Sequence, residues 1–374
     1  MTTTPPAEIG MPLEEVDTPA LLVDLDAFER NLDRMATALE GSPVRLRPHS
    51  KTHKCAVIGR MQIARGAVGV CCQKVGEAEA MVDGGIDDVL VSNEVVGARK
   101  LDRLAALSRR ARVAVCVDDP GQVAAIDAAA ARFDTTLSVL VEINNGAGRC
   151  GVEPGRPAVD LARRIADAPR LRFGGLQAYQ GRAQHIRDHA ERRAAIDHAV
   201  ALTRDTVEQL AAAGLECEIV GGAGTGTFRF EAASGVFNEL QAGSYVFMDA
   251  DYGRNLDAGG GPFSEFEHSL FVYATVMSKP DSGRAYLDAG LKAFSVDQGM
   301  PLVADFDGIT VTRASDEHAN LDLGGAGANI AVGDKIRLVP GHCDPTVNLY
   351  DWYVGIRNGR VESLWPIAAR GAAR

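Results

Sequence analysis

The sequence predicts an eight-stranded parallel β/α barrel of the TIM type, followed by a mainly β C-terminal domain. Short apolar, β-branched runs alternate with longer helical patterns between residues 19 and 252. Beyond the turn-rich segment 255–262 the helical periodicity ends, and short runs separated by Gly, Asp and Asn follow. No GxGxxG motif follows the first run, which disfavours a dinucleotide-binding doubly wound sheet. We therefore assign residues 19–252 to the barrel, and residues 1–18 together with 253–374 to the β domain.

Eight runs in the first part have the nearly continuous apolar character of strands that are buried on both faces of a parallel sheet. They are residues 20–25, 44–48, 68–73, 88–92, 113–117, 137–143, 173–179 and 217–221. In the second part, residues 269–277, 284–287, 335–339 and 352–356 are predicted strands, and Asn358-Gly359 is typical of a hairpin turn.

Helices between the barrel strands are predicted from their caps and from apolar spacing. Residues 26–40 open with the acidic cap Asp26 and carry apolar side chains three or four positions apart. Residues 74–85 end on two glycines, and residues 120–133 have a proline in the first turn. A long helix is predicted over residues 186–213, ending before Gly214.

The composition narrows the class of protein. The 374 residues are 46% hydrophobic and 24% charged, which is typical of a globular chain with a substantial core. A formal net charge of −11 and the lack of a long Lys/Arg cluster argue against a nucleic-acid partner. The start of the chain has no secretory pattern, and no stretch approaches the ~18 apolar residues of a membrane helix. Seven cysteines without CxxC spacing predict neither disulfides nor a structural zinc site. We expect a cytoplasmic enzyme without a membrane partner.

The segment 47–54, RPHSKTHK, lies between a predicted strand and an amphipathic pattern that begins at Val57. Barrels place chemistry where a strand ends and a helix begins, because the strand holds the residue while the loop exposes it. Lys51 is therefore a candidate catalytic residue, with His49 and His53 beside it. A solvated surface lysine is the competing interpretation.

The glycine-rich segment 221–227, GGAGTGT, follows the eighth predicted strand. Small residues allow backbone N–H groups to close on a phosphate, threonine hydroxyls add donors, and barrels commonly hold phosphates at this end. A plain glycine turn is the alternative. Together with a loop lysine, a phosphate site suggests pyridoxal phosphate held as a Schiff base.

A third group of polar residues lies in the β domain, in the loop PGHCDP at residues 340–345. In extended geometry His342 and Asp344 point the same way and Cys343 points the opposite way. An imidazole and a carboxylate can bind one divalent metal, although a hydrogen-bonded loop would contain the same residues. Residues 316–318, Asp-Glu-His, are a further polar candidate with a solvated loop as its alternative.

These motifs together resemble the D-threonine aldolase and D-serine dehydratase family of fold-type III pyridoxal-phosphate enzymes, which is alanine-racemase-like. The motifs that carry the resemblance are Arg47-Pro48-His49-x-Lys51, Glu142-Ile143, Gly148-Arg149-Cys150-Gly151-Val152, Asp288-Ala289-Gly290, Asp316-Glu317-His318 and Pro340-x-His342. They occur in the family's order and cover nearly the whole chain. The variants CCQKVGEAEA, QAYQG, FMDADYGR and PGHCDPT look closest to the 3-hydroxy-D-aspartate aldolase branch.

By that resemblance Lys51 forms the Schiff base, Arg149 faces the pyridine nitrogen and Tyr179 lies beside the ring. The residues that would surround the phosphate are Gly222, Gly224, Thr225, Gly243, Ser244 and Tyr245. His342 and Asp344 would bind a divalent metal. Since the second ligand is an oxygen here and a cysteine in some relatives, magnesium or manganese is expected before zinc. If Cys343 were the ligand, this assignment would fail.

The reaction that the resemblance implies is cleavage of the Cα–Cβ bond of a β-hydroxy-D-amino acid, with 3-hydroxy-D-aspartate or D-threonine as substrate. The products would be glycine and an aldehyde, either glyoxylate or acetaldehyde. The base that takes the hydroxyl proton could be His49, His53 or His318, and the sequence does not choose among them. The same groups could instead support a D-serine or D-threo-3-hydroxyaspartate dehydratase that gives a 2-oxo acid and ammonia.

Two other classes of protein remain open at this point. A non-catalytic pyridoxal-phosphate carrier would not need the 340–345 loop, and a metal-dependent hydrolase would leave Lys51 and the phosphate loop without a role. An acidic substrate would need a cation for its second carboxylate, for which Arg47, Arg182 and Arg254 are candidates, with a surface charge favoured for Arg182. Relatives with this architecture are commonly dimers, so we expect a homodimer.

Overall fold

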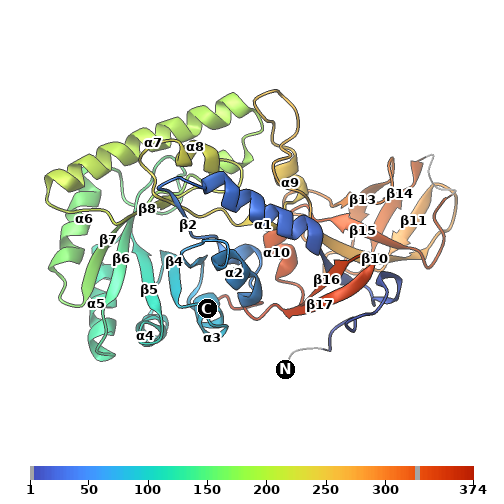
Figure 1. Ribbon diagram of the computed structural model, residues 1–374, viewed down its shortest axis with the longest axis horizontal. Coiled ribbons are helices and arrows are strands. Elements are labelled where there is room, and N and C mark those ends of the chain that lie inside the picture. Colours follow the sequence, from blue (N-terminus) through green and yellow to red (C-terminus); the bar gives the residue numbers. More distant parts are fainter. Residues whose placement is uncertain (1–3, 325–328) are drawn as a thin grey trace.

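The structure of the protein is a computed structural model that describes residues 4–324 and 329–374. It contains an eight-stranded parallel sheet and a nine-stranded, mainly antiparallel sheet, which lie side by side (Figure 1). The predicted fold class, a parallel β/α barrel with a mainly β domain, is confirmed. The proposed division at residue 252 stays a prediction, and residues 1–3 of the N-terminal part lie outside the described residues.

The strands of the barrel follow one another around the sheet in the order β2-β9-β8-β7-β6-β5-β4-β3. Hydrogen bonds from Val68 N to Leu46 O (2.9 Å) and from Cys71 N to Pro48 O (2.9 Å) join the two end strands and close the ring. The strands are β2 (Arg45–Leu46), β3 (Val70–Cys72), β4 (Asp88–Glu94), β5 (Arg112–Val117), β6 (Leu137–Glu142), β7 (Leu171–Gln177), β8 (Ile219–Gly222) and β9 (Glu239–Leu240).

One predicted barrel strand lies in the other sheet. The run predicted at residues 20–25 forms β1 (Ala20–Asp24), which pairs antiparallel with β10 (Leu270–Ser278) and parallel with β16 (Trp352–Arg357). The eighth barrel strand is β9, whose two residues were not predicted as a strand. A strand at the centre of either sheet is buried on both faces, so an apolar run does not say which sheet it joins.

The second sheet has the order β11-β14-β13-β12-β15-β10-β1-β16-β17 among the described residues. The predicted hairpin at Asn358-Gly359 is present, because Arg357 pairs with Arg360 across it. The remaining strands are β11 (Arg284–Leu287), β12 (Leu302–Val303), β13 (Thr310–Ala314), β14 (Ala319–Asp322), β15 (Lys335–Val339) and β17 (Arg360–Pro366).

The predicted helices begin within three residues of their predicted starts, but the cap of the first is Asp24 and not the predicted Asp26, which lies in the first turn. The Asp24 side chain accepts a hydrogen bond from Ala27 N (3.0 Å) at the start of α1, and the Asp188 side chain accepts one from Glu191 N (2.9 Å) at the start of α7. The helices are α1 (Leu25–Leu39), α2 (Ala56–Ile63), α3 (Val75–Asp83), α4 (Ala98–Leu107), α5 (Pro120–Arg132), α6 (Arg156–Asp167), α7 (His189–Ala212), α8 (Phe228–Ala232), α9 (Ala250–Gly253) and α10 (Cys343–Val347).

A single cluster of buried apolar side chains extends from the barrel into the second sheet. At their junction Phe28 of α1 packs against Phe247, with ring centroids 6.1 Å apart, and against Trp365 of β17 at 5.8 Å. The Tyr353 hydroxyl of β16 donates a hydrogen bond to the carbonyl of His53 (2.7 Å). The β domain is therefore fastened directly to the loop that carries Lys51.

Candidate active site

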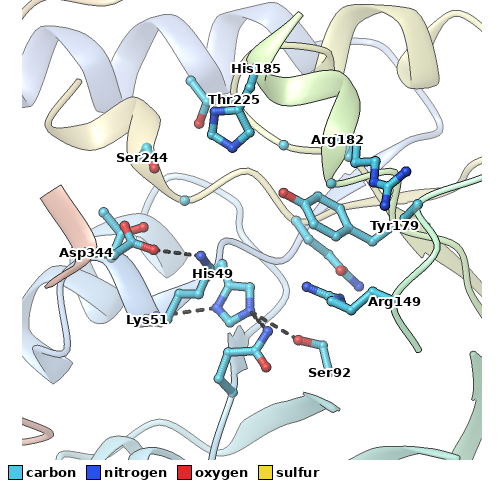
Figure 2. Close-up of a pocket in the computed structure, with 18 of the residues that line it drawn as sticks. His49, Lys51, Ser92, Arg149, Tyr179, Arg182, His185, Thr225, Ser244 and Asp344 are labelled. Atoms are coloured by element: carbon cyan, nitrogen blue, oxygen red, sulfur yellow. Dashed lines mark hydrogen bonds and ion pairs between the residues drawn. The ribbon is translucent and has the colours of Figure 1, made fainter. Parts of the chain in front are cut away.

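A cavity of about 480 Å³ lies at the carboxyl ends of the barrel strands, where the loops after β2, β6, β7, β8 and β9 meet the start of α10. Its lining includes Lys51, Tyr179, Thr225, Ser244 and Asp344, each from a different loop or element. Figure 2 shows these side chains facing a common space. The fold thus brings together predicted residues that are far apart in the sequence.

Lys51 lies in a short 3-10 helix, η2 (Ser50–Thr52), directly after β2. Its ammonium Nζ is 2.6 Å from Oδ2 of Asp344, and 39% of its side chain is exposed, toward the cavity. The Asp344 carboxylate raises the pKa of Lys51 above its ordinary value, although burial opposes this shift. Burial by itself would raise the pKa of the Asp344 carboxyl, but the Lys51 ammonium and the neighbouring His342 lower it below its ordinary value. The two groups therefore form a charged pair.

His49 has hydrogen-bond partners at both ring nitrogens. Its Nδ1 accepts a hydrogen bond from the backbone N–H of Lys51 (3.3 Å), and Nε2 lies 3.1 Å from Ser92 Oγ and 3.3 Å from Gln73 Nε2. Burial, with the nearby Lys51 ammonium, keeps the pKa of His49 well below its ordinary value. The ring is therefore neutral, and its lone pair at Nδ1 is directed at the backbone of the lysine loop.

The candidate metal ligands His342 and Asp344 both line the cavity. His342 Nδ1 is 2.8 Å from Asp297 Oδ2, and His342 Nε2 is 4.0 Å from Asp344 Oδ1. The extended geometry expected for this loop is not observed, since Cys343–Val347 form α10 with His342 as its N-cap residue. Cys343 nevertheless points away as predicted, because it is fully buried and its Sγ lies 3.3 Å from the carbonyl of Met248.

A histidine that was not predicted also lines the cavity. His185 ends the 3-10 helix η3 (Arg182–His185), and its Nδ1 is 2.7 Å from Oδ2 of Asp251. Asp251 is buried and also pairs with Arg187, and these two partners lower its pKa to about 2 despite its burial. The carboxylate therefore favours the tautomer of neutral His185 that carries the proton on Nδ1, in which Nε2 is an acceptor.

His185 was missed because the sequence pattern placed a helix start at residue 186. The D-x-x-E capping pattern formed by Asp188 and Glu191 marks the actual start of α7. Recognising that cap would have left residues 182–187 in the loop after β7, at the carboxyl end of the barrel, where a histidine is a candidate for chemistry.

Arg149 and Tyr179 form part of one wall of the cavity. The Arg149 guanidinium lies 5.7 Å from the centre of the Tyr179 ring and 3.6 Å from the buried Glu142 carboxyl. Burial and the neighbouring Glu94 raise the pKa of Glu142 to about 8. Gln177, the last residue of β7, and Gln241, directly after β9, also line the cavity and join these strands through two 2.8 Å amide hydrogen bonds.

The predicted phosphate residues divide into two groups. Gly224, Thr225, Gly243 and Ser244 line the cavity. Gly222 lies within β8, where its carbonyl accepts a hydrogen bond from Gln241 N, and the buried Tyr245 hydroxyl contacts Gln62 Nε2 at 3.1 Å. A Cβ atom on Gly243 would lie 2.7 Å from the His49 carbonyl, so glycine allows this loop to approach the lysine loop closely.

Two of the three histidines predicted as bases lie outside the cavity lining. His53 is fully buried, its Nδ1 accepts from Cys55 N (3.1 Å), and burial lowers its pKa to about 4. His318 is exposed in the turn between β13 and β14. Among the described residues of this chain, neither lines the cavity with Lys51.

The three candidate arginines also lie in different places. Arg47 is buried between Asp88 (2.5 Å) and Glu239 (2.8 Å) on β9, and Arg254 contacts the Gln298 carbonyl and Asp251. Arg182 lines the cavity. Its side chain is exposed to solvent, as the sequence favoured, and it is also part of the cavity wall.

The sequence matches the family described as "Alanine racemase, N-terminal domain" over residues 23–251, which is more than half of the chain. The chain belongs to this family. A second match, to "Putative serine dehydratase domain", covers residues 269–356. The family implies pyridoxal phosphate as a cofactor, and the family resemblance drawn from the motifs is confirmed. In the described part of the chain, no helix is long and apolar enough to span a membrane.

This member of the family is similar to several characterised proteins over nearly its full length. It is 50% identical to 3-hydroxy-D-aspartate aldolase of Paracoccus denitrificans (strain Pd 1222), covering 98% of this chain and 95% of that one. It is 45% identical to D-threonine aldolase of an Arthrobacter species, covering 99% and 97%. The crystal structure of D-threonine aldolase from Filomicrobium marinum has a TM-score of 0.96 and 53% identity, covering 99% of this chain and 100% of that one.

Proposed function

We propose that this protein is a pyridoxal-phosphate- and metal-dependent aldolase that cleaves the Cα–Cβ bond of a β-hydroxy-D-amino acid. The observation that carries the proposal is that one cavity contains a lysine, a histidine–carboxylate pair and a second histidine backed by a carboxylate. The full-length similarity to 3-hydroxy-D-aspartate aldolase and D-threonine aldolase supports the same reaction class. The products would be glycine and glyoxylate or acetaldehyde.

The residues at the cavity fit pyridoxal phosphate. Thr225 Oγ1 is buried without a hydrogen-bond partner among the described residues, and the backbone N–H groups of Gly224 and Thr225 have none either. Such donors suit a phosphate. Lys51 would hold the aldehyde carbon, and Tyr179 and Arg149 would lie along the ring. The assignment of Arg149 to the pyridine nitrogen stays a prediction. When bound, the cofactor accepts the electron pair that bond cleavage leaves on Cα.

The His342 and Asp344 side chains fit a divalent metal. Asp344 Oδ1 is buried without a hydrogen-bond partner in the described residues, and it lies 4.0 Å from His342 Nε2. Two ligands of one cation can be that far apart, because each bond is about 2.0–2.2 Å long. Asp297 at Nδ1 would hold the His342 ring, as carboxylates do beside metal-bound histidines. A magnesium or manganese ion there would lower the pKa of a hydroxyl.

We assign the role of base to His185. A base must have a free lone pair within the cavity, and Asp251 leaves Nε2 of His185 in that state. His49 is less suitable, because both of its ring nitrogens have partners. His185 would take the β-hydroxyl proton as the Cα–Cβ bond breaks, and Asp251 would stabilise the imidazolium that results.

A dehydratase is the second candidate, because residues 269–356 match a putative serine dehydratase domain. Incubation of the purified enzyme with pyridoxal phosphate, Mn²⁺ and either 3-hydroxy-D-aspartate or D-threonine separates the two reactions. An aldolase releases glycine with glyoxylate or acetaldehyde. A dehydratase releases ammonia with a 2-oxo acid, and that product would overturn the proposal.

The proposal includes a homodimer in the cytoplasm that acts on a small amino acid without a nucleic-acid or membrane partner. Support for the dimer comes from the resemblance, and the acidic composition without a long Lys/Arg cluster argues against a nucleic-acid partner. Sedimentation equilibrium of the holoenzyme would give the mass of one chain if the dimer assignment is wrong.

A further inference from the structure

We propose that Arg182 binds the side-chain carboxylate of the substrate and so selects β-hydroxy-D-amino acids that are diacids. This inference rests on the proposed aldolase function and concerns the same cavity. It names the substrate class that the overall similarity leaves open, since relatives of comparable identity are named for 3-hydroxy-D-aspartate and for D-threonine.

The positive charge of Arg182 is not neutralised by another side chain of the described residues. Its backbone N–H donates to Gln180 Oε1 (3.2 Å), but its guanidinium has no hydrogen bond or ion pair with any described residue. The other candidate arginines are engaged, Arg47 by Asp88 and Glu239, and Arg254 by Gln298 and Asp251. An arginine that lines a cavity and has no carboxylate partner within the protein can form two parallel hydrogen bonds with a carboxylate of the ligand.

Arg182 and His185 lie on the same short segment of the cavity wall. They are the first and last residues of η3, and in a 3-10 helix the side chains at positions i and i+3 project from the same face. Both line the cavity, where Figure 2 shows the Arg182 guanidinium beside Tyr179 and the His185 ring beside Thr225. A carbon that presents its hydroxyl to His185 would therefore present another substituent toward Arg182.

The chemistry of the β-carbon fits this arrangement. In 3-hydroxy-D-aspartate that carbon carries both a hydroxyl and a carboxylate, whereas in D-threonine it carries a hydroxyl and a methyl group. His342 and Asp344, on the opposite side of the cavity, are assigned to the metal, which leaves Arg182 as the candidate partner of the second carboxylate. Figure 2 shows Asp344 across the cavity from Arg182 and Arg149. A diacid substrate therefore has a cation, Arg182, available for its side-chain carboxylate.

The experiment compares the wild-type holoenzyme with Arg182→Gln, Arg182→Lys and, as a matched control, Arg109→Gln, an exposed arginine after α4. We expect Arg182→Gln to reduce kcat/KM for 3-hydroxy-D-aspartate by about 10-fold or more, since a charge-assisted bidentate bond is lost. For D-threonine the change should stay within about 2-fold. Arg182→Lys should recover only part of the loss, because lysine lacks the planar fork. Arg109→Gln should leave kcat/KM unchanged for both substrates.

Three results would overturn the inference. Equal losses for both substrates would place Arg182 on the α-carboxylate or in a structural role. An unchanged kcat/KM for both substrates would show that Arg182 is a surface charge without a role in binding. Full recovery by Arg182→Lys, with a strong dependence on salt, would indicate long-range attraction of anions.

A binding measurement separates this inference from the proposed function. D-Aspartate and D-asparagine have nearly the same shape, lack the hydroxyl and differ in the charge of the side chain. Calorimetry with the holoenzyme should show that Arg182→Gln weakens the binding of D-aspartate by about 10-fold or more and leaves the affinity for D-asparagine unchanged. Absence of glycine from wild-type reactions would refute the aldolase, while this charge-selective binding would still decide the role of Arg182.

Discussion

His185 Nδ1 lies 2.7 Å from Oδ2 of Asp251, a buried carboxylate whose pKa is lowered to about 2. This contact fixes the tautomer of the one cavity histidine whose second nitrogen has no partner in the described residues. The pair has the same arrangement as a catalytic histidine that is oriented by an aspartate.

Replacing His185 with glutamine should therefore lower kcat/KM about 100-fold or more while leaving the cofactor bound, since proton transfer typically contributes 10²–10⁴ to a rate. Steady-state kinetics and the absorbance of the bound cofactor near ~420 nm would be measured together. His198→Gln changes an exposed histidine of α7 and serves as the control. Unaltered turnover in His185→Gln would return the role of base to His49.

The metal assignment predicts different effects at two neighbouring residues. Asp344→Asn should abolish activation by Mn²⁺ and reduce turnover by at least about 100-fold, because a metal ligand is lost. Cys343→Ala should keep the metal response and lower only the melting temperature, because Cys343 is buried against the Met248 carbonyl. Metal titration of EDTA-treated enzyme is the measurement. Loss of the response in Cys343→Ala alone would identify the thiolate as the ligand.

The contact between Gly243 and the lysine loop predicts a steric effect. In Gly243→Ala the added Cβ would lie 2.7 Å from the His49 carbonyl and 2.8 Å from Thr52 Oγ1, so the loop that carries Lys51 has to shift. We expect a loss of about 1–3 kcal/mol in unfolding free energy and weaker retention of the cofactor. Gly283→Ala is the control, because its nearest neighbour would be Asp281 at 3.6 Å. Denaturation curves and cofactor titrations that match wild type would contradict this account.

Glu231 predicts a dependence of stability on pH. Burial raises the pKa of this carboxyl to about 8, so the folded protein keeps it protonated, whereas the unfolded chain releases the proton near its ordinary pKa of 4.5. The folded state then binds more protons between these two values, and the unfolding free energy must fall as pH rises from about 4.5 to about 8. The effect is on the order of a few kcal/mol.

The pH dependence caused by Glu231 can be tested by measuring the unfolding free energy of Glu231→Gln as a function of pH. The neutral amide keeps an acceptor for the Thr227 hydroxyl, which lies 2.9 Å from Glu231 Oε1, so the variant should lose less stability over this range than wild type does. Glu216→Gln, at an exposed position, should retain the wild-type slope. Parallel slopes for wild type and Glu231→Gln would show that the carboxyl is ionised in the folded protein.

Much of the barrel could be predicted because its strands and helices are encoded locally. The strand at residues 113–117 is a continuous apolar run and forms β5 (Arg112–Val117), and the proline-started helix at 120–133 forms α5 (Pro120–Arg132). The loop that carries Lys51 could be found because it follows a strand. His342 and Asp344 were found as a pair of ligand types close together in the sequence.

The features that could not be predicted depend on contacts between distant segments. Strand β9 has only two residues, so no periodicity marks it, and pairing with β2 and β8 forms it. His185 is significant because Asp251, from another loop, lies beside it. The three arginines Arg47, Arg182 and Arg254 are alike as sequence and differ only in which carboxylates the fold brings to them.

The place of β1 in the second sheet has a consequence for synthesis on the ribosome. Ala20–Asp24 is made early, but its two neighbours, Leu270–Ser278 and Trp352–Arg357, are made only after all the barrel strands. An apolar strand must therefore wait without its partners while the whole barrel is translated, and unpaired strand edges of this kind favour association with other chains. Nascent chains that stop before residue 352 are the ones we expect to need chaperones most.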